Sequence, residues 1–198
     1  MSDNLGIYLI AGLGNPGGAY KWTRHNVGFE VIGKLAYDYN IEMKGRKHRA
    51  VTGTGVISGQ KVRLAMPQTY MNLSGESIRD MLEYYGLPPD RLIVVYDDTA
   101  LPVGAVRIRG QGGAGGHNGM RNIIYHLETD IFPRVRIGIG EKPQGYNLAD
   151  YVLSRFTEAE RDGIIQGITQ AGDAVLDILK DGIIAAMNKF NRKVEQIE

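Results

Sequence analysis

Short apolar runs alternate along this sequence with longer stretches in which apolar residues recur at helical spacing. The first run, residues 8–12, is typical of a buried strand because it is short, apolar and ended by glycine. A helix is predicted to begin near Asn26, after a loop rich in glycine and proline. Alternation of this kind predicts an α/β fold, with a mixed β-sheet between helices.

Two later helices carry boundary signals. Thr157 and Glu160 form a capping box at the start of a long helix, and Gly182 is predicted to end it. Ser74 is the predicted N-cap of an earlier helix that runs to about Tyr85. The remaining predicted elements are strands at 48–57, 61–66, 92–96, 103–109 and 135–139, a helix at about 118–127, and a short last helix.

Length and composition narrow the class of protein. The 198 residues predict one domain, 1–198, and the lack of cysteine excludes disulfides and thiol catalysis. The chain begins without the features of a signal peptide, and no apolar run approaches the roughly 20 residues of a membrane span. We therefore expect a cytoplasmic protein with no membrane partner, and nothing demands more than a monomer. Because the net charge is only +1, nucleic-acid binding would need a local basic patch.

Residues 12–17 match the GxGxxG pattern of dinucleotide-binding proteins directly after a strand. That fingerprint needs its last glycine in the first turn of a helix, whereas here the loop continues past Gly18. The acidic residue at the expected distance, Asp38, falls at a helix end instead of a second strand. A dinucleotide site is therefore not favoured, and the motifs of serine-nucleophile hydrolases and P-loop proteins are absent.

Four segments are rich in polar residues that a plain scaffold would not need: 14–26, 67–75, 96–98 and 113–119. Three of them follow directly on predicted strands, at 8–12, 61–66 and 92–96. Ligands of open α/β sheets bind beyond the carboxyl ends of the strands. If these strands are parallel neighbours, the three segments meet at one edge of the sheet and form one site.

The polar segments hold the side chains that general-base hydrolysis requires. His25, with an ordinary pKa of about 6.5, can accept a proton from water at neutral pH. A carboxylate on its other ring nitrogen, from Asp97 or Asp98, would hold the tautomer and stabilise the imidazolium. Asparagine amides can donate to a developing oxyanion. An ester is favoured over an amide as the target, because its leaving group is better.

Each candidate also has a purely structural interpretation, as a helix cap or a turn residue. These interpretations apply to His25 before a helix, the Asp97–Asp98 pair in a turn, Asn15 before Pro16, Asn72 at a helix entry and His117–Asn118 as an N-cap. His48, placed in mid-strand, and His126, at a helix end, are interpreted as structural only. His25, Asp97 and His117 could also converge on a metal ion, but residues so scattered in sequence are a weak signal, and we predict no metal and no cofactor.

Six motifs, in order, resemble the signature blocks of the bacterial peptidyl-tRNA hydrolase family. They are GLGNPG with TRHNVGF, QTYMNLSGES, YDD with LPVG, GGAGGHNGMRNII, RVRIGIG and ADYVLSRF, and they run from Ala11 to Phe156. The joint match is far more specific than any single block. The resemblance implies a single three-layer α/β/α domain with a twisted mixed sheet. It also implies a metal-independent enzyme that hydrolyses the ester bond between tRNA and a peptide or N-blocked amino acid.

Carried over residue by residue, the resemblance implies that His25 is the general base and that Asp97 orients it. Successive side chains of a strand face opposite sides, so only one of Asp97 and Asp98 can face His25, and the family pattern selects Asp97. Asn15 would sense whether the amino group of the attached residue is blocked. Asn118 would hold the attacked carbonyl or the water. The other residues predicted to contact the acceptor end or the peptide are Tyr20, Tyr70, Met71, Asn72 and His117.

The sequence departs from the family pattern in two places. Thr99-Ala100 replace part of an acidic motif after the strand, which leaves the catalytic block intact but loosens its surroundings. Glu141-Lys142 stand where the family commonly has Arg-Pro or a similar pair, so the family's phosphate contacts do not transfer one by one.

The predicted tRNA contacts are less specific. Arg107 and Arg109 occupy alternate positions, hence one face, of a predicted strand and would contact tRNA phosphates. Arg134, Arg136 and Lys142, and separately residues 44–49, could extend this surface or could simply be solvated charges. Two other functions stay open: a relative that binds RNA without hydrolysing it, and a nucleoside or nucleotide enzyme on a similar sheet.

Overall fold

The first predicted strand lies at the centre of the sheet. In the computed structural model, which describes residues 6–191, β1 (Ile7–Gly12) pairs in parallel with both β4 (Gln60–Pro67) and β5 (Leu92–Asp98). β4, β1 and β5 are therefore the parallel neighbours that bring three polar segments to one edge. The sheet is completed by parallel β7 (Ile131–Gly138) and by antiparallel β2 (Gly45–Lys47), β3 (Ala50–Ile57) and β6 (Val106–Gln111), in the order β2-β3-β4-β1-β5-β7-β6.

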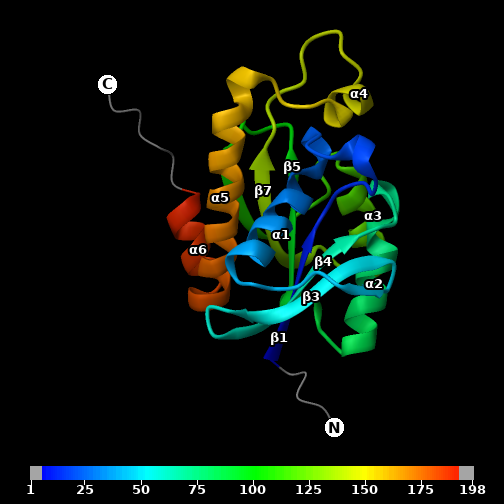
Figure 1. The fold of residues 1–198 in the computed structure, drawn as a ribbon, viewed down its shortest axis with the longest axis vertical. Coiled ribbons are helices and arrows are strands. Elements are labelled where there is room, and N and C mark those ends of the chain that lie inside the picture. Colours follow the sequence, from blue (N-terminus) through cyan, green and yellow to red (C-terminus); the bar gives the residue numbers. More distant parts are fainter. Residues whose placement is uncertain (1–5, 192–198) are drawn as a thin grey trace.

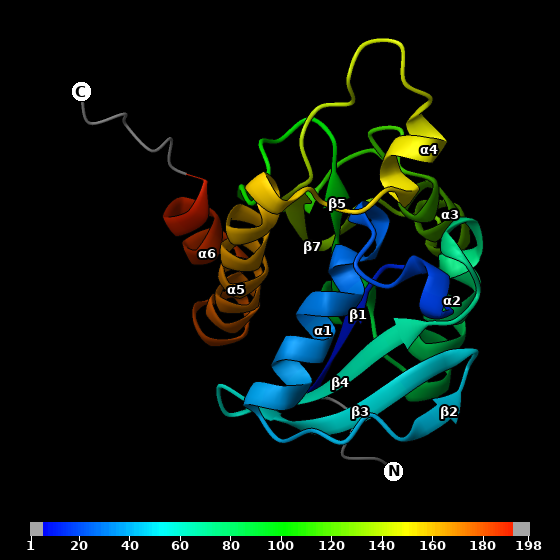
Figure 2. The same ribbon diagram turned by 45° about the horizontal axis from the view of Figure 1, so that its top comes forward.

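Alternate side chains of the central strands enter two separate cores. Ile10 of β1 packs in the core of α1 (Val27–Asp38) and α5 (Glu158–Asp181), whereas Leu9 packs in that of α2 (Ser74–Tyr85) and α3 (Asn118–Leu127). α6 (Ile183–Phe190) lies beside α5 (Figures 1 and 2). The three-layer α/β/α architecture with a mixed sheet is thus confirmed. Between residues 6 and 191, no helix combines the length and apolarity needed to cross a membrane.

Two glycines let α1 begin against the ends of β1 and β5. A Cβ atom on Gly28 would lie 2.4 Å from the backbone nitrogen of Leu13 and 2.5 Å from the carbonyl oxygen of Val95. A Cβ atom on Gly12 would lie 2.1 Å from the carbonyl oxygen of Gly28. Neither position has room for a side chain. The close approach brings the 3-10 turn Arg24–Asn26, which precedes α1, against β5 and, through Asn26, against Asn15 in the loop that follows β1.

Two residues do not have the local structure predicted for them. Ser74 is the first residue of α2 and not its N-cap, because a 3-10 turn precedes the helix and the Ser74 hydroxyl donates to the carbonyl of Met71 at 2.8 Å. His48 is not in mid-strand but shares with Arg49 the turn between β2 and β3, where their φ angles are 54° and 52°. A hairpin turn with positive φ angles usually carries asparagine or glycine, so His48 and Arg49 do not predict one.

Two strand boundaries also differ. The strand predicted at 103–109 is β6, Val106–Gln111, because Gly104, at φ 80°, holds the preceding residues in a turn. β7 begins at Ile131, four residues before the predicted 135, and it includes Pro133. Two elements were not predicted from the sequence: β2 and a short helix, α4 (Leu148–Leu153).

Candidate active site

A cavity of about 810 Å³ opens where β4, β1 and β5 end. All four polar segments contribute to its wall, and α4 supplies an apolar side through Leu148, Val152 and Leu153. Asn147 caps α4 by accepting a hydrogen bond from the Ala149 backbone at 2.8 Å, a signal that could have revealed this helix in the sequence. Most of the predicted site residues line the cavity, namely Asn15, His25, Tyr70, Met71, Asn72, Asp97, Arg109, His117 and Asn118.

Tyr20 and Arg107 lie outside the cavity lining. The Tyr20 ring meets that of Tyr70 edge-on, with 6.4 Å between centroids, so it supports a residue of the cavity mouth. Arg107 lies opposite Arg136 in the β6–β7 pairing. Of the two predicted phosphate-binding arginines, only Arg109 reaches the cavity.

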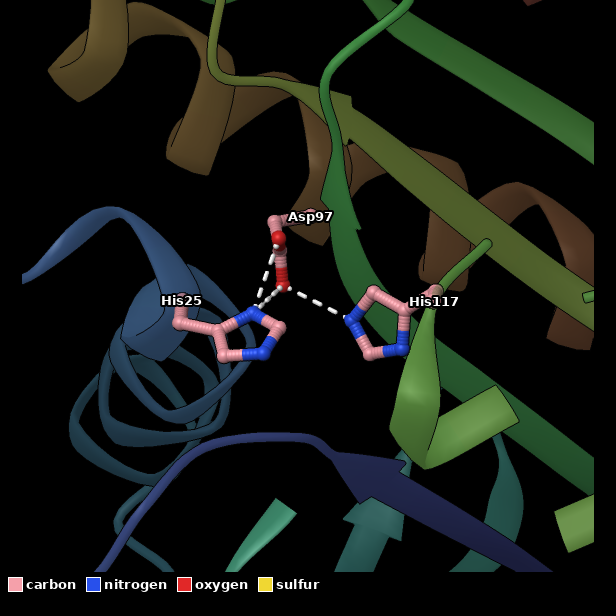
Figure 3. A group of neighbouring side chains, drawn as sticks. All are labelled: His25, Asp97 and His117. Carbon is pink, nitrogen blue, oxygen red and sulfur yellow. Dashed lines mark hydrogen bonds and ion pairs between the residues drawn. The ribbon is translucent and has the colours of Figure 1, made fainter. Parts of the chain in front are cut away.

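The centre of the cavity is a carboxylate shared by two histidines (Figure 3). Nδ1 of His25 lies 2.8 Å and 2.9 Å from the two carboxylate oxygens of Asp97, which is only 3% exposed. Nε2 of His117 lies 3.0 Å from Oδ1 of the same group. The other nitrogen of His25, Nε2, points away from Asp97 (Figure 3). That nitrogen is therefore the one available to take a proton from water.

Strand alternation selects Asp97 over Asp98 as the partner of His25. Val95 packs in the core on the α1 side of the sheet, so Asp97, two residues on, faces the turn that carries His25. Asp98 turns away, where its carboxylate pairs with Arg136 and accepts from the backbone nitrogen of Ala100 at 2.8 Å. Asp97, and not Asp98, is thus the residue in contact with His25, and its role in the reaction stays a prediction.

The hydrogen bonds of His117 define its tautomer. Its Nδ1 accepts the backbone N–H of Met120 at 3.2 Å, which makes His117 the N-cap of α3, as one interpretation of the sequence proposed. Because Nδ1 is an acceptor, the ring proton must be on Nε2, where it is donated to Asp97.

His25, Asp97 and His117 are also the group among the described residues that could hold a metal, since their ligand atoms lie within 4.8 Å of one another. A histidine nitrogen binds a metal only without its proton. The protonated Nε2 of His117 therefore fits a hydrogen bond better than a metal. We keep the prediction that the reaction needs no metal.

The buried pair shifts the pKa values of both its members. Burial alone would lower the pKa of His25, but the charge of Asp97 and its hydrogen bond outweigh burial and raise the pKa above its ordinary value. Burial would raise the pKa of Asp97, but His25 and then His117 outweigh it and hold that pKa well below its usual range. Asp97 therefore stays a carboxylate throughout the working pH range.

Arg24 anchors the His25 turn from the other side. Its guanidinium is buried and donates to both carboxylate oxygens of Glu160, at 2.9 and 2.8 Å. Glu160 also completes the predicted capping box with Thr157, which is confirmed. The same guanidinium donates to the carbonyl of Ile139 and lies over the rings of Tyr151 and Phe156. No role for Arg24 was predicted from the sequence.

Asn15 connects the His25 turn to the cavity mouth. Its backbone exchanges two hydrogen bonds of 2.9 Å with the side chain of Asn26, and its Oδ1 accepts the N–H of Met71 at 2.8 Å. The residue before Met71, Tyr70, has φ 60° and ψ 158°, a conformation that costs a non-glycine residue about 1–3 kcal/mol. With Oδ1 engaged, the amide nitrogen of Asn15 is the group left for a ligand.

The other asparagines are more exposed. Asn72 and Asn118 are both exposed at the cavity, and Oδ1 of Asn118 accepts from Arg121 at 3.2 Å, which leaves its amide nitrogen to donate. Arg134, expected as part of a basic surface, is buried instead. It donates to the carbonyls of Gly112 and Gly113 and so fixes the glycine-rich wall.

Comparison with known proteins agrees with this site. The family model described as peptidyl-tRNA hydrolase matches residues 9–197. The chain belongs to the peptidyl-tRNA hydrolase family. A member from Lachnoclostridium phytofermentans is 51% identical over 187 residues, covering 94% of this chain and 98% of its own. A member from Alkaliphilus oremlandii is 51% identical over 185 residues, covering 93% of this chain and all of its own.

Solved structures place the family on the same fold. The peptidyl-tRNA hydrolase of Acinetobacter baumannii superposes with a TM-score of 0.88 at 36% identity, covering 96% of each chain. A uridine phosphorylase from Vibrio fischeri superposes with a TM-score of 0.53 at 9% identity, covering 88% of this chain and 91% of its own. The similarity to the uridine phosphorylase shows only a shared arrangement of the sheet and its helices.

Proposed function

We propose that this protein hydrolyses the ester bond of peptidyl-tRNA, with His25 activating the attacking water. Membership of the family supports the substrate and the reaction. The observation that carries the mechanism is the His25–Asp97 pair, which presents a free imidazole nitrogen at a cavity with no cysteine nearby. We further propose a monomer that acts in the cytoplasm as one domain, 1–198.

The proposed reaction begins at Nε2 of His25. This atom takes a proton from water as the water oxygen bonds to the ester carbonyl carbon, and Asp97 stabilises the imidazolium that forms. The amides of Asn15 and Asn118 are the donors suited to the oxyanion of the tetrahedral intermediate. The intermediate then expels the ribose oxygen of tRNA, which takes the proton back from His25. The products are a free peptide acid and a tRNA hydroxyl.

Other residues that line the cavity could contact the tRNA acceptor end and the peptide of the substrate. One wall, for the acceptor end or the peptide, is formed by Tyr70, Met71 and Asn72. The ring of Tyr20 supports Tyr70, and Asn15 accepts the backbone N–H of Met71. Leu148 and Leu153 of α4 form an apolar wall. Binding energy from such non-reacting parts positions the ester at His25.

The proposal is tested by release of free tRNA from an N-blocked aminoacyl-tRNA, with an unblocked aminoacyl-tRNA as control. We expect hydrolysis of the blocked substrate only. Tight binding without release would identify an RNA-binding relative. Failure to bind or cleave either substrate would reopen the possibility of a nucleoside enzyme.

Arg109→Ala is expected to raise KM for full-length tRNA substrates and to flatten the dependence of KM on salt, with little change in kcat. Contacts with phosphates are electrostatic, and each adds about one unit to the salt slope. Arg107→Ala is the matched control from the same strand, and its effect should be smaller because it lies outside the cavity lining. Equal salt slopes in wild type and Arg109→Ala would place the tRNA elsewhere.

Chelation is expected to leave activity unchanged. The reason is the protonated Nε2 of His117, which leaves the buried cluster without a complete set of metal ligands. The measurement is kcat/KM before and after EDTA treatment, with the magnesium needed to fold the tRNA held constant. Loss of activity that zinc restores would overturn the metal-free mechanism.

A further inference from the structure

Among residues 6–191, Asp97 is the one carboxylate that contacts His25, and it also contacts His117. Oδ1 of Asp97 lies 2.8 Å from Nδ1 of His25 and 3.0 Å from Nε2 of His117. The two imidazole rings also lie close, with centroids 4.9 Å apart. One buried carboxylate thus receives hydrogen bonds from two rings, and only one of these rings has a nitrogen free for the reaction.

We propose that His117 is a positioning residue that acts on His25 through Asp97, keeping His25 unprotonated and ready as a base near neutral pH. This inference rests on the proposed function. The cap to Met120 fixes the His117 ring so that it donates its Nε2 proton to Asp97. A donor on a carboxylate stabilises its negative charge and weakens its pull on another proton. His117 therefore limits how far Asp97 raises the proton affinity of His25.

The surroundings of His117 suit a fixed donor. Its side chain is 7% exposed, and the ring of Tyr96 lies edge-on at 5.0 Å, which holds the ring in place. The cap, the aromatic contact and the carboxylate leave neither nitrogen of His117 free for the substrate. A role in binding tRNA directly, which the sequence suggested, therefore fits the geometry less well than a role through Asp97.

Other charged groups near His25 are already neutralised by partners of their own. Arg24, its neighbour in the chain, turns away to Glu160. Asp98 is paired with Arg136. The other titratable or cationic side chains of the cavity are Tyr70, Tyr96, Arg109 and Arg134, the last bound to backbone carbonyls. Asp97 and His117 are thus the groups that set the protonation of His25 from β5 and from the start of α3.

The test uses two variants that separate the N-cap role of His117 from its effect on the pKa of His25. In His117→Asn, the side-chain oxygen can still accept from Met120, but the side chain is too short to reach Asp97. His117→Ala loses both contacts. We expect the pKa of His25, measured by NMR titration of the free protein, to rise by about half to one unit in both variants. The chain has four histidines, and His25→Asn assigns the signal.

Thermal stability should fall mainly in His117→Ala, because asparagine is a good N-cap and alanine is not. His126→Asn, at the other end of α3, is the matched control and should leave the His25 pKa unchanged. An unchanged or lower pKa of His25 in His117→Asn would overturn the proposal, as would a rise confined to His117→Ala.

Turnover supplies the second readout. The acid limb of the kcat/KM profile should move to higher pH in His117→Asn by the same amount as the His25 pKa. A loss of activity that is equal at every pH would show a merely structural role and overturn the proposal. The NMR titration needs no substrate, so it remains decisive for His117 even if the protein does not hydrolyse peptidyl-tRNA.

Discussion

Replacing His25 by asparagine is expected to lower kcat by about 10²–10⁴-fold, the usual contribution of a general base. The asparagine amide nitrogen occupies the place of Nδ1 and can still donate to Asp97, so the buried carboxylate keeps its partner. What is lost is Nε2, the ring nitrogen that points away from Asp97 (Figure 3) in a residue that lines the cavity. The expected result is therefore a folded protein that binds substrate but turns it over slowly. Single-turnover release of tRNA measures the effect on the chemical step.

Two further variants make the result interpretable. His126→Asn is the same substitution outside the cavity and should keep the wild-type rate. His25→Ala removes both the Nδ1 donor to Asp97 and the Nε2 base, so it should lose as much activity as His25→Asn. It should also lose some stability, because the buried Asp97 carboxylate then has His117 as its one remaining histidine partner. A folded His25→Asn protein with a wild-type kcat would remove His25 from the mechanism.

Asp97→Asn is expected to have the second-largest effect, a fall in kcat of between about 10²- and 10⁴-fold. The larger figure is the cost of the equivalent change in a serine-protease triad, and water is a freer nucleophile than a fixed serine. An amide at this position can donate to Nδ1 of His25 and so favour the tautomer whose Nε2 carries the proton. That tautomer cannot act as the base.

The pH profile of Asp97→Asn gives a second signature. In the wild type, Asp97 raises the pKa of His25, and the base works only above that pKa. Without the carboxylate, the charged form of His25 loses its partner and the pKa falls. The acid limb of kcat/KM should therefore move to lower pH, opposite to the shift expected for His117→Asn.

Asp98→Asn is the matched control for this variant. The Asp98 carboxylate pairs with Arg136 and accepts a hydrogen bond from the backbone nitrogen of Ala100. Loss of the carboxylate should therefore change stability more than kcat. If Asp98→Asn proved the more damaging to kcat in folded protein, the assignment of Asp97 would be reversed.

The position of the site could be predicted from the sequence because it follows from strand ends. Parallel β4, β1 and β5 each end in a polar segment, and a parallel sheet brings such ends together. Alternation of side chains along β5 predicted that only one of Asp97 and Asp98 faces His25, and the family pattern selected Asp97. Both inferences depend on local pattern and strand direction, which the sequence contains.

Other parts of the site depend on packing between distant elements, which leaves little local signal. The sequence suggested His117 as an N-cap, but not its second bond to Asp97, because that bond requires the start of α3 to meet the end of β5. Tyr70 and His48 adopt positive φ although neither is glycine or asparagine, and contacts to Asn15 and Ser77 hold their segments in place. Turn preferences alone could not predict either conformation.

The ion pair between Arg24 and Glu160 forms late during synthesis of the chain. It joins residues 136 positions apart, and the ribosome delivers the chain from its N-terminus. The His25 turn emerges early, but the Arg24–Glu160 ion pair can form only after the first turn of α5 has emerged and docked. An unfinished copy is itself a peptide esterified to tRNA, the kind of molecule we propose this enzyme cleaves. Each nascent chain therefore lacks the Arg24–Glu160 anchor of its His25 turn until most of its synthesis is over.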